Sequence, residues 1–236
     1  MSENNENMDI GAFRAGFKSK KSEQTQVSPA VIKRLPRYFR YLRQLLTDDI
    51  RRISSGELSR MMNVTASQIR QDFNCFGGFG QQGYGYNVKY LYTKIGELLG
   101  VSSGLTAVIV GAGNLGSALA SSPIFERRGI RLLALFDNNP SLIGTEKYGH
   151  PVYSTDSMEK YIKENNVDIA IITVPRSAAP ETSEQLAKYG IKGLWNFTSN
   201  ELDVSKYGVA TENVHLGDSL MTLCYKVTQK NDTENK

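Results

Sequence analysis

The spacing of apolar residues changes about halfway along the chain. Between residues 28 and 99 the apolar positions recur every three or four residues, which is typical of amphipathic helices. From residue 105 onward, short continuous apolar runs alternate with helical patterns. The change predicts a helical unit, residues 28–101, followed by an α/β unit, residues 105–214, with the boundary in the Gly- and Ser-rich segment between them. A separate helix is expected over residues 215–229.

The first expected helix begins at Ser28, which can cap it, with Pro29 in its first turn. Its buried stripe is predicted to consist of Ile32, Leu35, Phe39, Leu42 and Leu46. Residues 1–27 are rich in Asn, Glu, Ser, Lys and Gln and show no sustained periodicity. We therefore expect a disordered tail there, and a second one over residues 230–236.

Two short helices follow, with almost nothing between them. Ser54–Glu57 and Thr65–Gln68 each have the form of a capping box, and they open segments that run to Met62 and Phe76. Such close spacing is typical of a helix-turn-helix. The second helix should turn Ile69, Phe73 and Phe76 inward, so its outward side chains would be Ser67, Gln68, Arg70, Gln71 and Asn74.

A glycine-rich segment, residues 77–86, comes next and alternates glycines with aromatic residues. Five glycines in ten positions suit a tight hairpin, because glycine tolerates the positive φ that such turns require. Asn87 then caps a helix that is expected to run to about Leu99. A helix, a helix-turn-helix and a hairpin together predict a winged-helix DNA-binding domain.

The second half predicts a Rossmann fold, a doubly wound parallel sheet covered by helices on both faces. The expected buried strands are Thr106–Gly111, Ile130–Asp137, Val167–Pro175 and Lys192–Phe197. The expected helices between them are about Asn114–Phe125, Thr155–Glu164 and Ala178–Tyr189.

The first of these strands leads into a dinucleotide-binding fingerprint. Gly111, Gly113 and Gly116 form a GxGxxG pattern between a strand and a helix, and Asp137 ends the next strand 21 residues after Gly116. The glycines would allow the tight turn, admit the pyrophosphate and let helix and strand pack closely, while the acid would accept hydrogen bonds from the adenosine ribose. The candidate cofactor site comprises Gly111, Ala112, Gly113, Asn114, Leu115, Gly116 and Asp137.

The residues after Asp137 favour NAD(H) over NADP(H). They are Asn138 and Asn139, and neither can neutralise a 2′-phosphate held against a carboxylate.

Charge is distributed unevenly between the two halves. Residues 1–101 contain 15 Lys and Arg against 9 Asp and Glu, whereas the remainder contains 13 against 15. The asymmetry favours a polyanionic partner for the first half, although a solvated basic face would give the same count. No apolar run is long enough to cross a bilayer and there is no signal-peptide core, so we expect a cytoplasmic location.

Neither cysteine belongs to a recognisable site. Cys75 and Cys224 lie 149 positions apart without a CxxC or Cys/His cluster, which argues against a zinc site and a disulfide framework. Their simplest role is that of small buried apolar residues.

Catalytic residues are poorly represented near the expected nicotinamide. A dehydrogenase needs a proton donor and substrate anchors there, but His150 lies in a predicted turn and His215 precedes the last helix. Tyr90 and Lys94 match a YxxxK pattern but lie before the glycine-rich turn. Only one helix follows the α/β unit, so we expect a binding protein, with an NAD-dependent oxidoreductase as the weaker alternative.

Several motifs, in order along residues 28–228, resemble those of the Rex family of redox-sensing transcriptional repressors. They are Ile32–Tyr38, Phe79–Val88, Gly111–Gly116, Phe136-Asp137, Ile172–Pro175, and Gly190–Gly193 leading to Asn196-Phe197. The resemblance implies that the protein binds a near-palindromic operator while NADH is scarce and releases it on binding NADH. It also adds Val174 and Pro175 to the cofactor site.

The resemblance further implies a homodimer whose last helix, about Leu216–Thr228, exchanges between subunits. An apolar stripe suited to packing on the partner consists of Leu216, Leu220, Leu223, Cys224 and Val227. A stripe that closes the helix onto its own domain is the alternative.

DNA contacts are expected from three segments. Major-groove candidates are Ser67, Gln68, Arg70 and Gln71, since Gln and Arg can each make two hydrogen bonds to a purine edge. Phosphate candidates are Lys33, Arg34, Arg37 and Arg40, some of which could equally form a solvated face. The hairpin would enter the minor groove with Gln81, Gln82 and Tyr84.

The chain departs from the family pattern in two places. Basic residues are usual where it has Gln71, Gln81 and Gln82, so we expect weaker DNA binding with a flatter salt dependence. Candidate switch positions differ as well: a tyrosine, an aspartate and an aromatic residue are common in the family at Ser122, His215 and Leu216.

In the family the aspartate can pair with an arginine that matches Arg40, and a histidine cannot form the same salt bridge. A DNA-binding regulator with a structural or repurposed NAD(H) site is therefore a second hypothesis.

Overall fold

The computed structural model describes residues 27–75, 80–81, 84–101 and 103–234. They belong to two compact units, Met1–Ile95 and Gly96–Lys236. The division falls within helix α4 (Val88–Leu98), a few residues before the segment where the apolar spacing changes. A unit boundary inside a helix leaves no break in the apolar pattern, so the sequence could not mark it.

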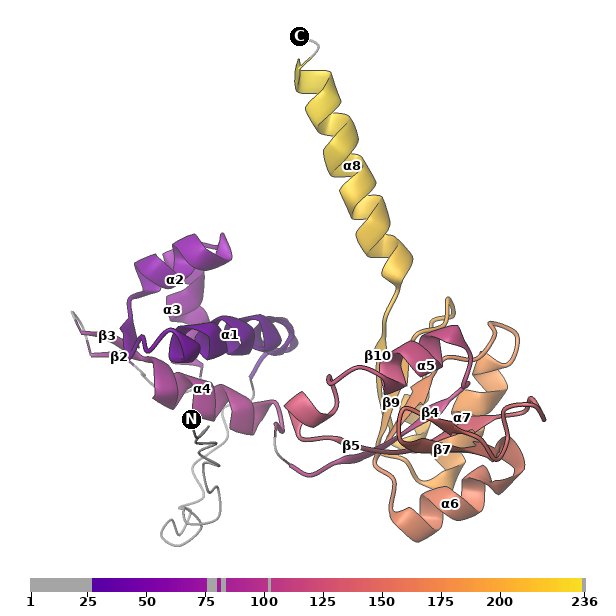
Figure 1. Ribbon diagram of the computed structural model, residues 1–236. Helices are drawn as coiled ribbons and strands as arrows, with labels where there is room; N and C mark the ends of the chain where they lie inside the picture. The colour runs from indigo at the N-terminus through magenta and orange to yellow at the C-terminus, as the bar shows by residue number, and fades with distance from the viewer. Residues whose placement is uncertain (1–26, 76–79, 82–83, 102, 235–236) are drawn as a thin grey trace, which may run out of the picture. The chain divides into compact units, whose positions relative to one another are not determined.

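The first unit is a winged helix, as predicted (Figure 1). It contains α1 (Pro29–Thr47), α2 (Ser55–Met62), α3 (Ala66–Asn74) and most of α4. A three-stranded antiparallel sheet has the order β1-β3-β2, with β1 at Arg52–Ile53, β2 at Gly80–Gln81 and β3 at Gly85–Asn87. Strand β1 was not predicted, because two residues are too few to show an alternating pattern.

The predicted helix starts of this unit are confirmed by their caps. Ser28 caps α1, and Ser54 forms a complete capping box with Glu57 at the start of α2. The Thr65 hydroxyl accepts a hydrogen bond from the Gln68 amide at 3.1 Å, and the Asn87 side chain accepts one from the Tyr90 amide at 2.8 Å. Helix α3 ends at Asn74, and Phe76 lies outside the described residues.

The buried face of α1 differs from the predicted stripe. Ile32 is 49% exposed and Leu46 is only half-buried. The buried residues are Val31, Leu35, Tyr38, Phe39, Leu42 and Leu45. Tyr38 can be buried because its hydroxyl donates a hydrogen bond to the buried Asp72. The helix face that carries Tyr38 is therefore the buried one, and Ile32 lies on the face towards solvent.

The second unit is a Rossmann-type domain built on a seven-stranded sheet of order β10-β9-β8-β4-β5-β7-β6. Its parallel strands are β4 (Thr106–Val110), β5 (Arg131–Asp137), β7 (His150–Ser154), β8 (Ile169–Ile172), β9 (Gly193–Asn196) and β10 (Ala210–Asn213). Only β6 (Glu146–Lys147), at the edge, runs antiparallel to its neighbour. The four predicted strands are all present, with β8 and β9 shorter than expected.

Strands β6, β7 and β10 were not predicted. The turn expected around His150 consists of Tyr148 and Gly149, which have φ angles of 53° and 83°. His150 itself is the first residue of β7. The prediction that His150 lies in a turn was therefore wrong by one residue, because the hairpin is tighter than its composition suggested.

Helices cover both faces of the sheet. Buried residues of α6 (Met158–Asn165) and α7 (Ala179–Tyr189) share one apolar cluster with Val108 and Val110. Ala120 of α5 (Asn114–Ala120) shares the other cluster with Ala107 and Ile109. The prediction ran α5 on to Phe125, but the helix ends at Ala120, three residues before Pro123.

The last helix, α8 (Leu216–Glu234), begins where predicted (Figure 1). It continues through residues 230–234, so the prediction of a disordered tail from residue 230 was wrong for these residues. Every side chain described along it, residues 216–229, is exposed. Leu216, Leu220 and Leu223 are 55–62% exposed, so the apolar stripe does not close onto its own domain. Cys224 is exposed too, contrary to the expectation of a buried residue, while Cys75 is half-buried. Across the described helices, none has the length and apolar character of a membrane span.

Candidate functional site

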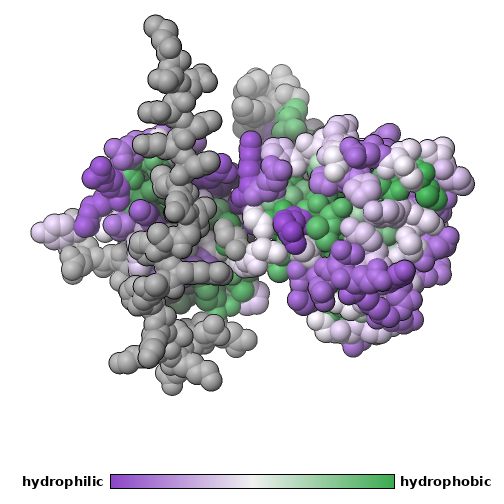
Figure 2. Space-filling model, turned by 60° about the horizontal axis from the view of Figure 1, so that its bottom comes forward, coloured by the Kyte–Doolittle hydropathy of each residue, from purple (hydrophilic) through white to green (hydrophobic). Residues whose placement is uncertain are grey.

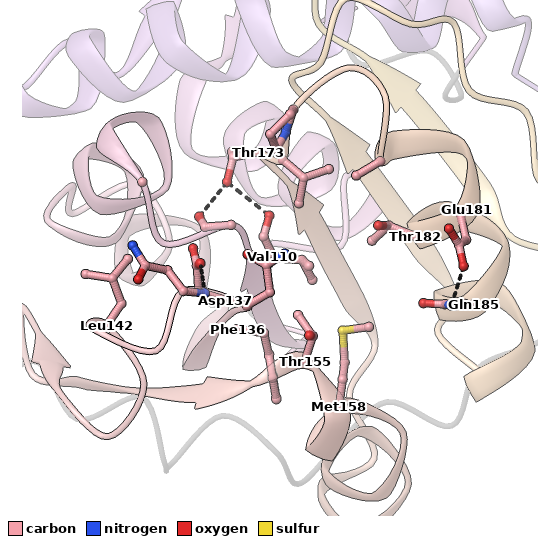
Figure 3. A pocket seen from close by; sticks show the side chains of 17 residues that line it. Val110, Phe136, Asp137, Leu142, Thr155, Met158, Thr173, Glu181, Thr182 and Gln185 are labelled. Carbon is pink, nitrogen blue, oxygen red and sulfur yellow. Dashed lines mark hydrogen bonds between the residues drawn. The ribbon is translucent and has the colours of Figure 1, made fainter.

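A cleft of about 820 Å³ opens at the carboxyl ends of β4, β5 and β8 (Figure 3). Strands β5 and β8 flank β4 on opposite sides, so the cleft lies where the strand order reverses. Ligands of doubly wound sheets bind at such a position. Its lining combines apolar side chains, among them Phe136, Leu142 and Met158, with polar side chains such as those of Asp137 and Thr182.

The glycines of the fingerprint lie where two chain segments meet closely. Gly111 has a φ of 102°, and a Cβ there would come within 2.7 Å of the Thr173 carbonyl oxygen. A Cβ on Gly116 would lie 1.9 Å from the Gly111 carbonyl oxygen. The tight turn and the close packing of helix and strand therefore both depend on glycine.

Gly113 is different, because a Cβ there would meet nothing within 4 Å. This residue lines the cleft. Its open surroundings leave room for a ligand to approach the backbone of the turn.

Asp137 already binds the glycine-rich turn. One carboxylate oxygen accepts a 2.7 Å hydrogen bond from the Ala112 amide, and the other accepts a 2.8 Å bond from the Asn139 amide. A carboxylate has about four acceptor positions, so Asp137 can still accept from a ribose hydroxyl. The Thr173 hydroxyl closes the turn from the other side, with its one hydrogen shared between the carbonyls of Gly111 at 2.8 Å and Val110 at 3.1 Å (Figure 3).

Five of the nine predicted cofactor residues line the cleft: Gly111, Gly113, Asp137, Val174 and Pro175. The others belong to the turn or the start of α5, where Ala112 and Gly116 are buried, Leu115 is half-buried and Asn114 is exposed. Sequence patterns missed the remaining lining residues, because these come from segments without a motif. They include Leu142, Thr155, Met158, Glu181, Thr182 and Gln185.

A buried carboxylate organises the other candidate site, in the first unit. Asp72 of α3 has no exposed surface, and it accepts two 2.7 Å hydrogen bonds from the Arg34 guanidinium. The Tyr38 hydroxyl and the Gln68 side-chain amide each donate a further bond of 2.8 Å. Burial alone would raise the pKa of Asp72, but these hydrogen bonds outweigh it and hold that pKa below its usual value. Burial and the bond to Asp72 raise the pKa of Tyr38 far above the ordinary value.

The predicted DNA-binding residues fall into two groups. Arg34 and Gln68 are engaged with Asp72, and Arg37 donates a hydrogen bond to the Met62 carbonyl. Arg70 is exposed but donates to the Ser55 hydroxyl at 3.1 Å. The candidates outside these side-chain contacts are Lys33, Ser67, Gln71 and Tyr84; all four are exposed, Tyr84 by 69%. The Gln81 side chain and the whole of Gln82 lie outside the described residues.

The four predicted switch residues have separate surroundings. Arg40 is exposed on α1, with its guanidinium 5.8 Å from the centre of the Tyr41 ring. Ser122 lines a second cavity of about 640 Å³ in the other unit. Leu216 is exposed, and His215 places Nε2 3.0 Å from Oε1 of Glu201. His215 thus has an acidic partner within its own chain, which the sequence did not indicate.

Two family models match the chain. The model described as "Putative DNA-binding protein N-terminus" matches residues 26–74, and that described as "CoA binding domain" matches residues 104–200. The first match spans α1 to α3 of the winged helix, and the second spans strands β4 to β9 of the Rossmann-type domain.

Curated relatives match nearly the whole chain. A redox-sensing transcriptional repressor Rex from Clostridium tetani is 49% identical over 89% of this chain and 99% of its own length. Its counterpart from Clostridioides difficile is 53% identical over 84% of this chain and 94% of its own.

Solved structures agree with these relatives. RSP, a Rex-family repressor, crystallised in complex with β-NAD+ and operator DNA, superposes with a TM-score of 0.82 at 48% identity over 89% of this chain and 96% of the other. RSP in complex with β-NADH gives a TM-score of 0.81 at 45% identity, covering 89% of this chain and 98% of the other.

Proposed function

Because this chain belongs to the Rex family of redox-sensing transcriptional repressors, we propose that it binds operator DNA when NADH is scarce and releases it when NADH binds. One observation carries this reading: a winged helix and a dinucleotide cleft occur in one chain that matches Rex repressors over 84–89% of its length. Its relatives are named repressors, and the protein is a regulator and not an enzyme. Since its DNA partner is the chromosome, we place it in the cytoplasm.

The cofactor of the proposed function is NAD(H), and the cleft suits it. A volume of about 820 Å³ lies within the range of small-molecule sites. Phe136, Leu142 and Met158 offer an apolar surface for the adenine ring, and Asp137 is the acceptor for the ribose hydroxyls. The open backbone at Gly113 would receive the pyrophosphate.

Recognition of DNA is assigned to α3, the second helix of the helix-turn-helix. Its exposed polar side chains at Ser67, Arg70 and Gln71 are free of the Asp72 cluster and would reach base edges. Arg34 and Gln68 contact Asp72 and would act first by holding α3 in place. Lys33 and Arg37 on α1 would contact phosphates, and Tyr84 would lie with the wing.

Homodimerisation is assigned to α8. Its apolar side chains form an exposed stripe in the single chain. Exposure of such a contiguous apolar surface to water is unfavourable and is typical of a protein–protein interface. Exchange of α8 between two subunits would cover the stripe. A two-fold dimer would then present two copies of α3 to a near-palindromic operator.

The main experiment is an operator-binding titration of the full-length dimer at fixed salt. A duplex selected by the protein from a random library would be labelled, and binding followed by fluorescence anisotropy while NADH or NAD+ is added separately. Release by NADH at concentrations where NAD+ has little effect would support the redox sensor. Equal effects of both nucleotides, or no effect of either, would contradict it and favour a repressor with a structural NAD(H) site.

A matched pair of variants connects the release to the cleft. Asp137→Asn keeps the size of the side chain but removes the charge that accepts from the ribose, so NADH should release the operator only at higher concentration. Asp156→Asn changes an exposed carboxylate outside the lining of the cleft and should behave as the unmodified protein.

A further inference from the structure

A lysine from the edge of the sheet contacts the glycine-rich turn, although no sequence motif points to it. Lys147 lies in β6, and its ammonium donates hydrogen bonds of 2.8 Å to the Ala112 carbonyl and to the Ser117 hydroxyl. The Ser117 hydroxyl donates to the same carbonyl at 3.0 Å. The Lys147 side chain is half-buried. A cation 35 positions along the chain is thus held against the residue between Gly111 and Gly113.

Charged groups bind the backbone of Ala112 at both ends. Its amide donates to the Asp137 carboxylate at 2.7 Å, and its carbonyl accepts from the Lys147 ammonium. Hydrogen bonds to ionised groups are roughly twice as strong as those between neutral groups. Ala112 itself is fully buried. These contacts therefore fix the orientation of the turn whose glycines line the cleft.

Lys147 is not paired directly with an acid, because the carboxylate that binds the turn, Asp137, contacts the Ala112 amide and the ammonium contacts the Ala112 carbonyl. Of the ion pairs formed between residues that the structure describes, none includes Lys147. Burying part of an ammonium costs free energy unless an anion or hydrogen-bond acceptors compensate it, and the contacts here are two neutral oxygen atoms. The Lys147 ammonium therefore supplies a positive charge on the carbonyl side of Ala112 that offsets the charge of Asp137 and would favour an anion docking beside Gly113.

We propose that Lys147 is a positioning residue for the dinucleotide: it holds the glycine-rich turn and supplies a positive charge that stabilises the bound pyrophosphate. The inference rests on the proposed NAD(H) site. Because the pyrophosphate is common to NAD+ and NADH, Lys147 raises the affinity for both by the same factor. It sets how much dinucleotide binds, and leaves discrimination between the two redox forms to other residues.

The test measures direct binding of four probes by calorimetry: NAD+, NADH, ADP-ribose and adenosine. Lys147→Met removes the charge and the hydrogen-bond donors at similar length. The affinities for the three probes that contain pyrophosphate should each fall about tenfold, while adenosine binding stays unchanged. Lys147→Arg keeps the charge and should retain most of the affinity. Lys188→Met, at an exposed position of α7, serves as the control.

Circular dichroism would establish that Lys147→Met is folded. If it is not, Ser117→Ala tests the same contact by removing one of the two acceptors, with an expected loss of about two- to threefold. Equal affinity of the unmodified protein and the folded variant for NADH would overturn the proposal and leave the NAD(H) site intact. Equal losses for adenosine and NADH would overturn the role of the charge. Failure of the unmodified protein to bind any dinucleotide would overturn the proposed function as well.

Discussion

Arg34 of α1 and Asp72 of α3 form a two-pronged salt bridge, with both hydrogen bonds at 2.7 Å. The carboxylate is completely buried, while the Arg34 side chain keeps 35% of its surface exposed. The planar guanidinium matches the carboxylate geometry, which a lysine at this position could not do. The pair therefore fixes the angle at which α3 leaves the domain core, and with it the direction of the side chains that would meet DNA.

Removal of Arg34 should destabilise the first unit. Arg34→Met keeps the aliphatic stem but leaves Asp72 buried without its cation, so the free energy of unfolding should fall by about 3 kcal/mol. Hydrogen exchange of the α1 and α3 amides in increasing urea would measure the loss. Lys33→Met, one residue earlier and exposed, should leave the stability unchanged. A loss of similar size in both variants would show that the salt bridge is not its cause.

Asp72 also makes the stability of this unit depend on pH. Its pKa is lowered in the folded state, so its contribution is present above the usual carboxyl value of about 3.9 and is lost as the pH falls through the lower, folded value. Asp72→Asn should therefore be less stable than the unmodified protein at pH 7, and the difference should shrink below about pH 4. Acid titrations of both proteins at fixed urea, followed by circular dichroism, would measure this. A difference that stays constant with pH would rule out an ionised Asp72.

Lys33 should contribute to operator affinity through a phosphate contact. Lys33→Gln should weaken binding to operator and unrelated DNA by the same factor, and reduce the slope of log K against log salt by about one. Anisotropy titrations at four salt concentrations would give both quantities. Lys188→Gln in the other unit is the control with an equal change of net charge. An unchanged salt slope in Lys33→Gln would mean that Lys33 belongs to a solvated face.

Two glycines of the fingerprint should respond differently to the same substitution. Gly116→Ala forces a Cβ to 1.9 Å from the Gly111 carbonyl oxygen, so the domain should lose about 1–3 kcal/mol or more of stability. Gly113→Ala meets no protein atom within 4 Å and should fold normally. Its methyl group would instead obstruct the ligand. We expect NADH affinity to fall about tenfold, which corresponds to a loss of about 1.4 kcal/mol of binding free energy. Thermal unfolding and NADH titration of both variants would separate the two effects.

Sequence patterns predicted best those features whose physical cause is local. The caps at Ser28, Ser54 and Asn87 each depend on residues within three positions, and all were found as expected. The GxGxxG turn also combines a short spacing with a steric requirement at Gly111 and Gly116, which the structure shows directly. Winged helix and Rossmann-type domain followed from these signals.

Contacts between residues that are distant along the chain could not be predicted from local sequence patterns. Arg34 and Gln68 have polar side chains at helix positions that suggest DNA contact, but the partner of Arg34 lies 38 residues away. The half-buried Lys147 was missed because it lies in a two-residue strand without an apolar pattern. The cleft-lining residues Leu142 and Met158 belong to no motif either, because the fold alone brings them together.

The contact between His215 and Glu201 is expected to influence the response to NADH, because α8 begins at the next residue. Glu201 also accepts a 3.1 Å hydrogen bond from Asn213 of β10, so the pair ties the start of α8 to the sheet. His215→Gln and Glu201→Gln should each shift the NADH concentration that releases half of the operator by about two- to fivefold, since a pair whose carboxylate is exposed contributes modestly. The double variant should show no larger shift, because each substitution removes the same interaction. Glu212→Gln, on an exposed position of β10, is the control for the loss of one charge. Independent, multiplying effects of the two substitutions would mean that His215 acts through a partner other than Glu201.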